Sequence, residues 1–298
     1  MGKQIVLDLP EKVKILGISG SPRKEGNTAS MVRYCLDWAE KTGYAETEYL
    51  SLANYKLFPC TGCMRCFGFM APADDPHQCY ENLDDDTKVL VPKVAECDGL
   101  LIGFPVYSGG VPSILRIFKE KMHISGPMSF TKEAGALRYK ALAIISQGGQ
   151  VYGGQEVNYH EMARGADMLI VSAWPTVDAP MPSSSFIGGM LTTIDGMAIY
   201  GKNAWKKEAT RTVPPASGSR NERTLKNLGR WLAVAAMTLR LGRAAFKQAG
   251  YYAPEAAPFT KYSVKPKPGS YVDKLIKEGK VTFVSQDDLK IKKPSAKG

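Results

Sequence analysis

Short apolar runs alternate along the chain with segments whose apolar residues recur at helical spacing. The runs expected to form buried strands are 13–18, 47–50, 100–104, 139–146 and 168–172. The segments with helical patterns are 31–38, 87–96, 114–122, 155–165 and a long last one at 222–249. Strands that alternate with helices form a parallel sheet covered on both faces, because right-handed crossovers carry each helix over the sheet. The pattern therefore predicts an α/β fold.

The predicted elements divide the chain into three parts. Residues 1–172 form the core, a doubly wound five-stranded parallel sheet of flavodoxin-like order with a cysteine-rich loop at 58–82. Residues 173–250 supply an irregular insertion rich in Pro, Ser and Gly, then the last helix that completes the core. Residues 251–298 are a basic, proline-punctuated C-terminal extension, which we expect to be an arm that wraps a neighbouring subunit.

The net charge of +10 comes mainly from the C-terminal part of the chain. No zinc finger, basic zipper or RNP pattern accompanies the charge, so we expect a docking surface for an acidic partner and no nucleic-acid binding. No apolar run reaches the length of a membrane span, and no apolar signal core follows Met1. The sequence therefore predicts a cytoplasmic protein with no membrane partner.

Four closely spaced cysteines carry much of the chemical information: Cys60, Cys63, Cys66 and Cys79. Their spacing, C-x2-C-x2-C-x12-C, resembles the ferredoxin run more than the two separated knuckles of a zinc ribbon. We therefore expect a 4Fe-4S cluster in preference to zinc or free thiols. Cys35 and Cys97 fall in apolar patterns and are expected in the core, with Cys97 as the reserve fourth ligand should Cys79 not reach.

A polar loop follows the first predicted strand and leads into the first helix. It reads Ser19-Gly20-Ser21-Pro22-Arg23-Lys24-Glu25-Gly26-Asn27-Thr28. A helix N-terminus offers unpaired N–H groups and a positive dipole end, and the hydroxyl, amide and guanidinium groups here could complete an anion site. The loop matches neither G-x4-G-K-[ST] nor G-x-G-x-x-G, so it suits a monophosphate such as that of FMN. Ordinary turn chemistry is the alternative, and the position after the first strand favours the phosphate.

Two more loops follow the third and fourth predicted strands. Their residues are Pro105, Val106, Tyr107, Ser108 and Gly109 in one, and Ser146, Gln147, Gly148 and Gly149 in the other. In a doubly wound sheet both loops lie at the same edge as the phosphate loop, where a flavin ring would rest. Tyr107 could pack on the ring, and backbone N–H groups near Ser108 could bond its heteroatoms. Each loop alone would be a plain glycine turn, whereas three at one edge favour a flavin site.

Taken together, these segments are similar to those of the iron-sulfur flavoproteins, within the wider NADPH-dependent FMN reductase group. The resemblance covers residues 13–172 and rests on the stretch 17–23 with Asn27-Thr28, on the loop that begins at Pro105, and on the position of the cysteines after the second strand. It implies that the first loop binds the FMN phosphate, that residues 105–109 bind the ring, and that the four cysteines ligate the cluster. Two departures are the long gap before Cys79 and the C-terminal extension.

The resemblance also implies a function. An oligomeric FMN-dependent oxidoreductase, a homodimer or homotetramer, would pass electrons between a ferredoxin-like donor and an acceptor through the cluster and FMN. For a small-molecule acceptor, Tyr107 or His123 is the candidate proton donor. One alternative is a clusterless NAD(P)H-dependent FMN or quinone reductase, which direct reduction by NADPH would favour. Another is a redox-sensing protein that binds nucleic acid through its basic region, which salt-sensitive DNA binding without turnover would favour.

Overall fold

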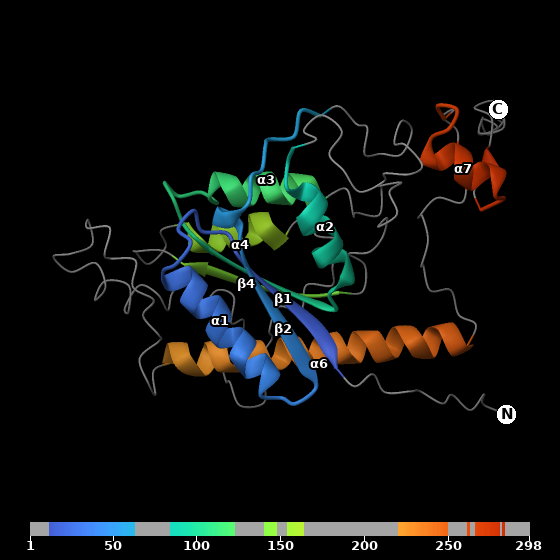
Figure 1. Cartoon of the computed structure of the whole chain (residues 1–298). Coiled ribbons are helices and arrows are strands. Elements are labelled where there is room, and N and C mark those ends of the chain that lie inside the picture. Colours follow the sequence, from blue (N-terminus) through green and yellow to red (C-terminus); the bar gives the residue numbers. More distant parts are fainter. Residues whose placement is uncertain are drawn as a thin grey trace, which may run out of the picture.

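The first four strands lie side by side in one parallel sheet in the computed structural model of the chain (Figure 1). The structure describes residues 12–62, 84–122, 140–147, 154–163, 220–249, 261–262, 266–280 and 282–283. The first elements are β1 (Val13–Ser19), α1 (Asn27–Glu40), β2 (Ala45–Ser51), the 3-10 helix η1 (Leu52–Asn54), α2 (Thr87–Glu96) and β3 (Gly99–Pro105). The later elements are α3 (Ser113–Met122), β4 (Ala141–Gln147), α4 (Gln155–Ala163), α6 (Arg220–Ala249), β5 (Lys261–Tyr262), α7 (Tyr271–Lys277) and β6 (Thr282–Phe283).

The strand order β2-β1-β3-β4 confirms the predicted flavodoxin-like fold. Every pairing within this sheet is parallel, and the chain runs outward from β1 to β2 before it crosses back to β3. The order therefore reverses between β1 and β3, which is the switch point where doubly wound sheets bind ligands. The fifth strand predicted at 168–172 lies outside the described residues.

Helices cover both faces of the sheet, which explains why the strands are almost continuously apolar. α1 and α6 cover one face, and α2, α3 and α4 cover the other (Figure 1). The core on the α1 face includes Ile15, Leu101 and Ile145, and the core on the opposite face includes Ile18 and Phe104. α1 is therefore positioned by its packing against the sheet and against α6.

Two glycines let α1 lie unusually close to the strands. A Cβ atom on Gly103 would lie 2.5 Å from Cγ2 of Val32, and one on Gly17 would lie 2.6 Å from Cδ1 of Leu36. Real side chains do not approach so closely, so α1 could not keep this position over any larger residue. Its N-terminus is thereby held at the switch point.

The described helices differ from the sequence prediction mainly at their ends. α1 begins at Asn27 and not at 31, and the last helix begins at Arg220 and not at 222. Residues 164–165 of the helix predicted at 155–165 lie outside the described residues. Within the predicted C-terminal arm, Ser270 caps a short helix, α7, and β5 pairs with β6. Helix ends are set by local capping, which apolar periodicity does not report. None of the described helices is long and apolar enough to cross a membrane.

The crossing of α1 and α6 provides a test of this packing. A Cβ atom on Gly229 would overlap the backbone carbonyl oxygen of Cys35, whereas a Cβ atom on Gly242, in the same helix, would meet nothing within 4 Å. We expect Gly229→Ala to lower the free energy of unfolding by about 1–3 kcal/mol through overpacking. Gly242→Ala should instead be neutral or stabilising by up to about 1 kcal/mol, because alanine favours helix. Urea unfolding of both variants measures this, and equal effects would contradict the close crossing.

Candidate functional site

The carboxyl ends of the four strands bring the predicted loops to one edge of the sheet. Ser19 of β1 is in register with Ser51 of β2 and with Gly103 of β3, and Pro105 at the end of β3 is in register with Gln147 of β4. Each predicted site residue in the described ranges therefore belongs to this edge or to the segment that follows it.

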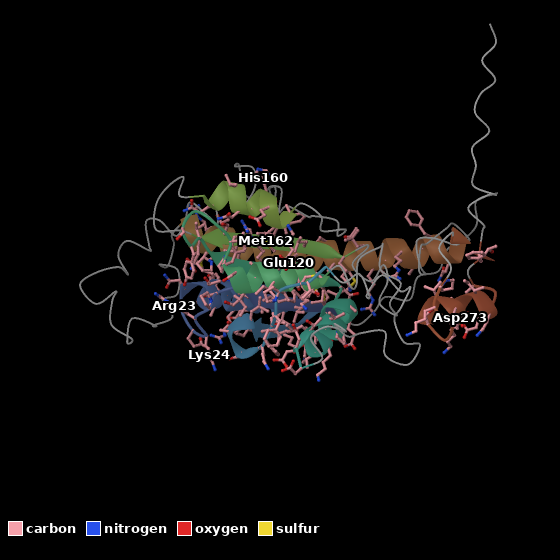
Figure 2. All side chains as sticks on the ribbon, turned by 90° about the horizontal axis from the view of Figure 1, so that it is seen from above. Arg23, Lys24, Glu120, His160, Met162 and Asp273 are labelled. Carbon is pink, nitrogen blue, oxygen red and sulfur yellow. The ribbon has the colours of Figure 1, made fainter. Side chains whose placement is uncertain are left out.

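The loop before α1 leaves the helix N-terminus open to an anion. Gly26 is the N-cap, no side chain caps the helix, and no acidic residue lies in its first turn. The loop is held from within by the Arg23 N–H, which donates to Ser21 Oγ at 3.1 Å, and from below by the Gly20 N–H, which donates to the Gly103 carbonyl at 2.7 Å. Arg23 and Lys24 are exposed beside this helix end (Figure 2). The arrangement combines free N–H donors, the positive helix dipole and cationic side chains.

Glu25, the acidic residue of this loop, is paired with Arg33, which offsets its negative charge next to the proposed anion site. Arg33 of α1 donates to both carboxylate oxygens of Glu25, at 2.7 Å for the Nη2–Oε1 bond. These hydrogen bonds hold the pKa of Glu25 below its ordinary value. The guanidinium also lies 4.1 Å from the ring centroid of Tyr49 on β2. Nothing in the sequence indicates this contact, because its partners come from a loop, a helix and a strand.

Gln147 connects the loops after β1, β3 and β4. Its side-chain Nε2 donates to Thr28 Oγ1 at 2.6 Å, and its backbone carbonyl accepts the Val106 N–H at 2.6 Å. Three residues predicted from separate motifs are therefore in direct contact. Gly148 and Gly149, also predicted for this site, lie outside the described residues.

Buried hydroxyl groups at the same edge lack hydrogen-bond partners within the described part of the chain. They are Oγ of Ser19, Ser51 and Ser146 and the hydroxyl of Tyr49. The Tyr49 hydroxyl lies near Ser19 and Ser51 without a hydrogen bond of good geometry, and burial raises the pKa of Tyr49. A buried hydroxyl without a hydrogen bond costs free energy, because it has given up its bonds to water. A polar ligand at this edge could form hydrogen bonds with these hydroxyl groups and so be bound more tightly.

A tight turn after β3 presents Tyr107 to solvent. The Tyr107 N–H donates to the Gly110 carbonyl at 3.0 Å and the Gly110 N–H donates back at 2.9 Å, while Ser108 and Gly109 have φ values of 49° and 74°. Positive φ at both central residues is the type I′ geometry, which is strained for serine. The Tyr107 side chain is 42% exposed, so its ring is accessible for stacking.

The first turn of α4 holds this turn in place, a role that the sequence analysis missed. Asn158 Nδ2 donates to the Gly109 carbonyl at 3.2 Å, and a Cβ atom on Gly154 would lie 2.7 Å from the same oxygen. Asn158 is almost fully buried. The only local signal in the sequence is Gly154, just before the predicted helix. A glycine there is common and does not indicate that Gly109 is its neighbour. His123, the other proton-donor candidate, lies outside the described residues.

The two ends of the cysteine-rich loop are joined by a stem, defined here as residues 56–58 and 84–86. The Lys56 N–H donates to Asp86 Oδ2 at 2.6 Å, and the Asp86 N–H donates to the Lys56 carbonyl at 2.8 Å. Lys56 Nζ also pairs with Asp84 Oδ2 at 2.5 Å. In the sequence, Cys60 comes two residues after residue 58 of the stem, and Cys79 comes five residues before residue 84.

A buried ion pair lies under the stem. Asp85 Oδ2 accepts the Phe58 N–H at 2.8 Å and lies 3.4 Å from Lys121 Nζ of α3, while Oδ1 accepts the Thr87 N–H at 2.7 Å. The exposed fractions of the Lys121 and Asp85 side chains are 2% and 0%. The acidic run 84–86 therefore anchors the loop.

Cys60 is exposed at the stem, whereas Cys97 is buried in the core, as predicted for Cys97. Cys97 follows the far end of α2, and the ten residues of that helix span about 15 Å from the stem. Burial raises the pKa of Cys97 to about 11, and its thiol donates to the Val94 carbonyl. Cys97 is therefore no longer a candidate ligand beside Cys60. Cys63, Cys66 and Cys79 lie outside the described ranges, within which no three His, Cys, Asp or Glu side chains form a metal-binding group.

The sheet order and the loops at its edge define a protein of the flavodoxin-like class. The family model described as NADPH-dependent FMN reductase matches residues 13–179. An iron-sulfur flavoprotein of Methanocaldococcus jannaschii is 35% identical over 150 residues, 50% of this chain and 69% of that protein. One of Methanosarcina thermophila is 33% identical over 144 residues, 48% of this chain and 68% of that protein. A solved flavone reductase structure has 17% identity, a TM-score of 0.45, and coverage of 76% of this chain and 64% of its own.

The chain therefore belongs to the NADPH-dependent FMN reductase family and, within it, to the iron-sulfur flavoproteins. It is an FMN-dependent oxidoreductase.

The contribution of the buried Asp85–Lys121 ion pair can be tested by substitution. Lys121→Met would leave the Asp85 carboxylate buried without its cation, so we expect a loss of about 3–5 kcal/mol in the free energy of unfolding. The control is Lys93→Met, since Lys93 pairs with Glu48 at the surface and should contribute about 1 kcal/mol or less. Urea unfolding of the whole chain compares them. Similar small losses in both variants would show that the pair does not anchor the stem.

Proposed function

We propose that the protein passes electrons between a ferredoxin-like donor and an acceptor through a 4Fe-4S cluster and FMN. The observation that carries this proposal is the closed stem. Its hydrogen bonds join the residues that flank the C-x2-C-x2-C-x12-C segment in the sequence. The similarity to iron-sulfur flavoproteins of two archaea supports it.

The residues at the carboxyl edge fit FMN. Arg23, Ser21 and the N–H groups of Asn27 and Thr28 would hold the phosphate at the open start of α1, and Pro22 shapes that loop. The unpartnered Ser19 hydroxyl would face the same ligand. Because Glu25 is paired with Arg33, its carboxylate would not repel the phosphate.

The ring would lie against the turn after β3. Residues 105–109 offer backbone N–H groups and an exposed Tyr107 ring, and Ser146 and Gln147 border them at the end of β4. α4 fixes the turn through Asn158, so these donors are held before any ligand binds. Tyr107 would also give a proton to a small-molecule acceptor.

Cys60, Cys63, Cys66 and Cys79 would hold the cluster, because thiolates are the ligands that iron-sulfur clusters take and this spacing is the ferredoxin run. When bound, FMN would allow exchange between one-electron transfer at the cluster and two-electron chemistry at the acceptor. The chain itself contributes the placement of both groups. Cluster thiolates must stay reduced, which fits a cytoplasmic location.

The proposed partners follow from charge and from the family resemblance. The basic C-terminal part would dock an acidic ferredoxin-like donor, and NAD(P)H or a small molecule would be the other reactant. We keep a homodimer or homotetramer as the expected assembly. The family description names NADPH, which favours one alternative: a reductase in which NADPH reduces FMN directly, without the cluster.

Cysteine substitutions separate these two functions. Cys79→Ser should lose iron, retain FMN and lose reduction by ferredoxin at least tenfold, whereas Cys97→Ser should keep iron and rate, because Cys97 is buried away from the stem. Anaerobic stopped-flow absorbance of the flavin, with reduced ferredoxin or NADPH, gives the rates. Rapid reduction by NADPH in both variants, with ferredoxin inactive even on the unsubstituted protein, would favour the clusterless reductase.

A further inference from the structure

A carboxylate of α3 lies at the first cysteine of the motif. Oε2 of Glu120 accepts the backbone N–H of Cys60 at 3.2 Å. The two residues are sixty positions apart, so the contact depends on the fold and is not a local turn. Glu120 lies on the last turn of α3, where Figure 2 labels it.

The buried pair under the stem holds both partners of this contact. Lys121, the neighbour of Glu120, is fixed by Asp85, which also accepts the Phe58 N–H two residues before Cys60. The helix turn that bears Glu120 and the loop segment that bears Cys60 are therefore anchored to one carboxylate. Breaking either link would move Glu120 relative to Cys60.

The nearby cations of α3 are directed toward other groups. Arg116, one turn before Glu120, pairs with the Glu161 carboxylate at 2.9 Å, and Lys119 donates to the Glu161 backbone carbonyl. Lys121 faces Asp85, and those two charges offset each other. The Glu120 carboxylate places a negative charge beside the backbone N–H of Cys60.

We propose that Glu120 is a positioning residue for Cys60 and that its charge lowers the reduction potential of the cluster. The inference rests on the proposed function, since it requires Cys60 to be a ligand. Reduction adds an electron to the cluster, and a carboxylate close to a ligating cysteine opposes that added charge. In contrast, the Gly62 N–H donates to Cys60 Sγ at 3.4 Å, a bond that favours the reduced state. The potential is then set by two opposing groups at a single ligand.

Glu120→Gln tests the charge while keeping an acceptor for the Cys60 N–H. We expect the cluster midpoint potential to shift upward, with the FMN potential changing less, in an anaerobic redox titration followed by EPR for the cluster and visible absorbance for the flavin. Glu48→Gln is the matched control, because it removes the same charge from an exposed carboxylate that pairs with Lys93 elsewhere on the sheet. Glu120→Asp keeps the charge, so its cluster midpoint potential should lie nearer that of the unsubstituted protein than the potential of Glu120→Gln does.

The outcomes separate this inference from the function beneath it. If the unsubstituted protein holds no iron, the proposed function fails. If it holds a cluster whose potential and iron content are the same in Glu120→Gln as in Glu48→Gln, the role of Glu120 is overturned while the function stands. Loss of iron from Glu120→Gln alone, with FMN and circular dichroism unchanged, supports the positioning of Cys60 by Glu120.

Discussion

The close approach of α1 to the sheet is the constraint on which the candidate flavin site depends. Gly17 and Gly103 place no side chain between the strands and α1. The first turn of α1 can therefore reach the switch point between β1 and β3. Only there can Thr28 meet Gln147 from β4. A helix displaced by a side chain on either strand would separate the proposed phosphate site from the proposed ring site, although every residue of both motifs would remain.

The cysteine-rich loop depends on a different constraint, closure of its two ends. Closing a loop costs entropy that rises only slowly with length, so a long insertion is tolerable where the closure is well anchored. The buried Asp85–Lys121 pair and the hydrogen bonds of the stem provide that anchor. The long gap before Cys79 therefore needs no rearrangement of the core, because the core ends at the stem.

The sequence predicted β1 to β4 and the loops that follow them because these depend on local patterns. β3 is buried along its whole length, and only a continuous apolar run such as 100–104 is compatible with that. Tertiary partners were not predictable in the same way. Nothing in the sequence indicates that Asp85, Lys121 and Asn158 meet their partners in buried contacts, because those partners come from distant parts of the chain. The apolar pattern around Cys97 predicted its burial, but the sequence did not show that the whole length of α2 separates it from the stem.

The central claim is that one protein binds FMN at the carboxyl edge of the sheet and an iron-sulfur cluster at the cysteine-rich loop. The most direct test is to measure the cofactor content of the protein purified without oxygen. Iron, acid-labile sulfide, zinc and flavin would be quantified together with the visible spectrum. The account predicts about four irons and about four sulfides for each FMN. FMN without iron, or zinc in place of iron, would contradict the cluster, and absence of both flavin and iron would contradict the account as a whole.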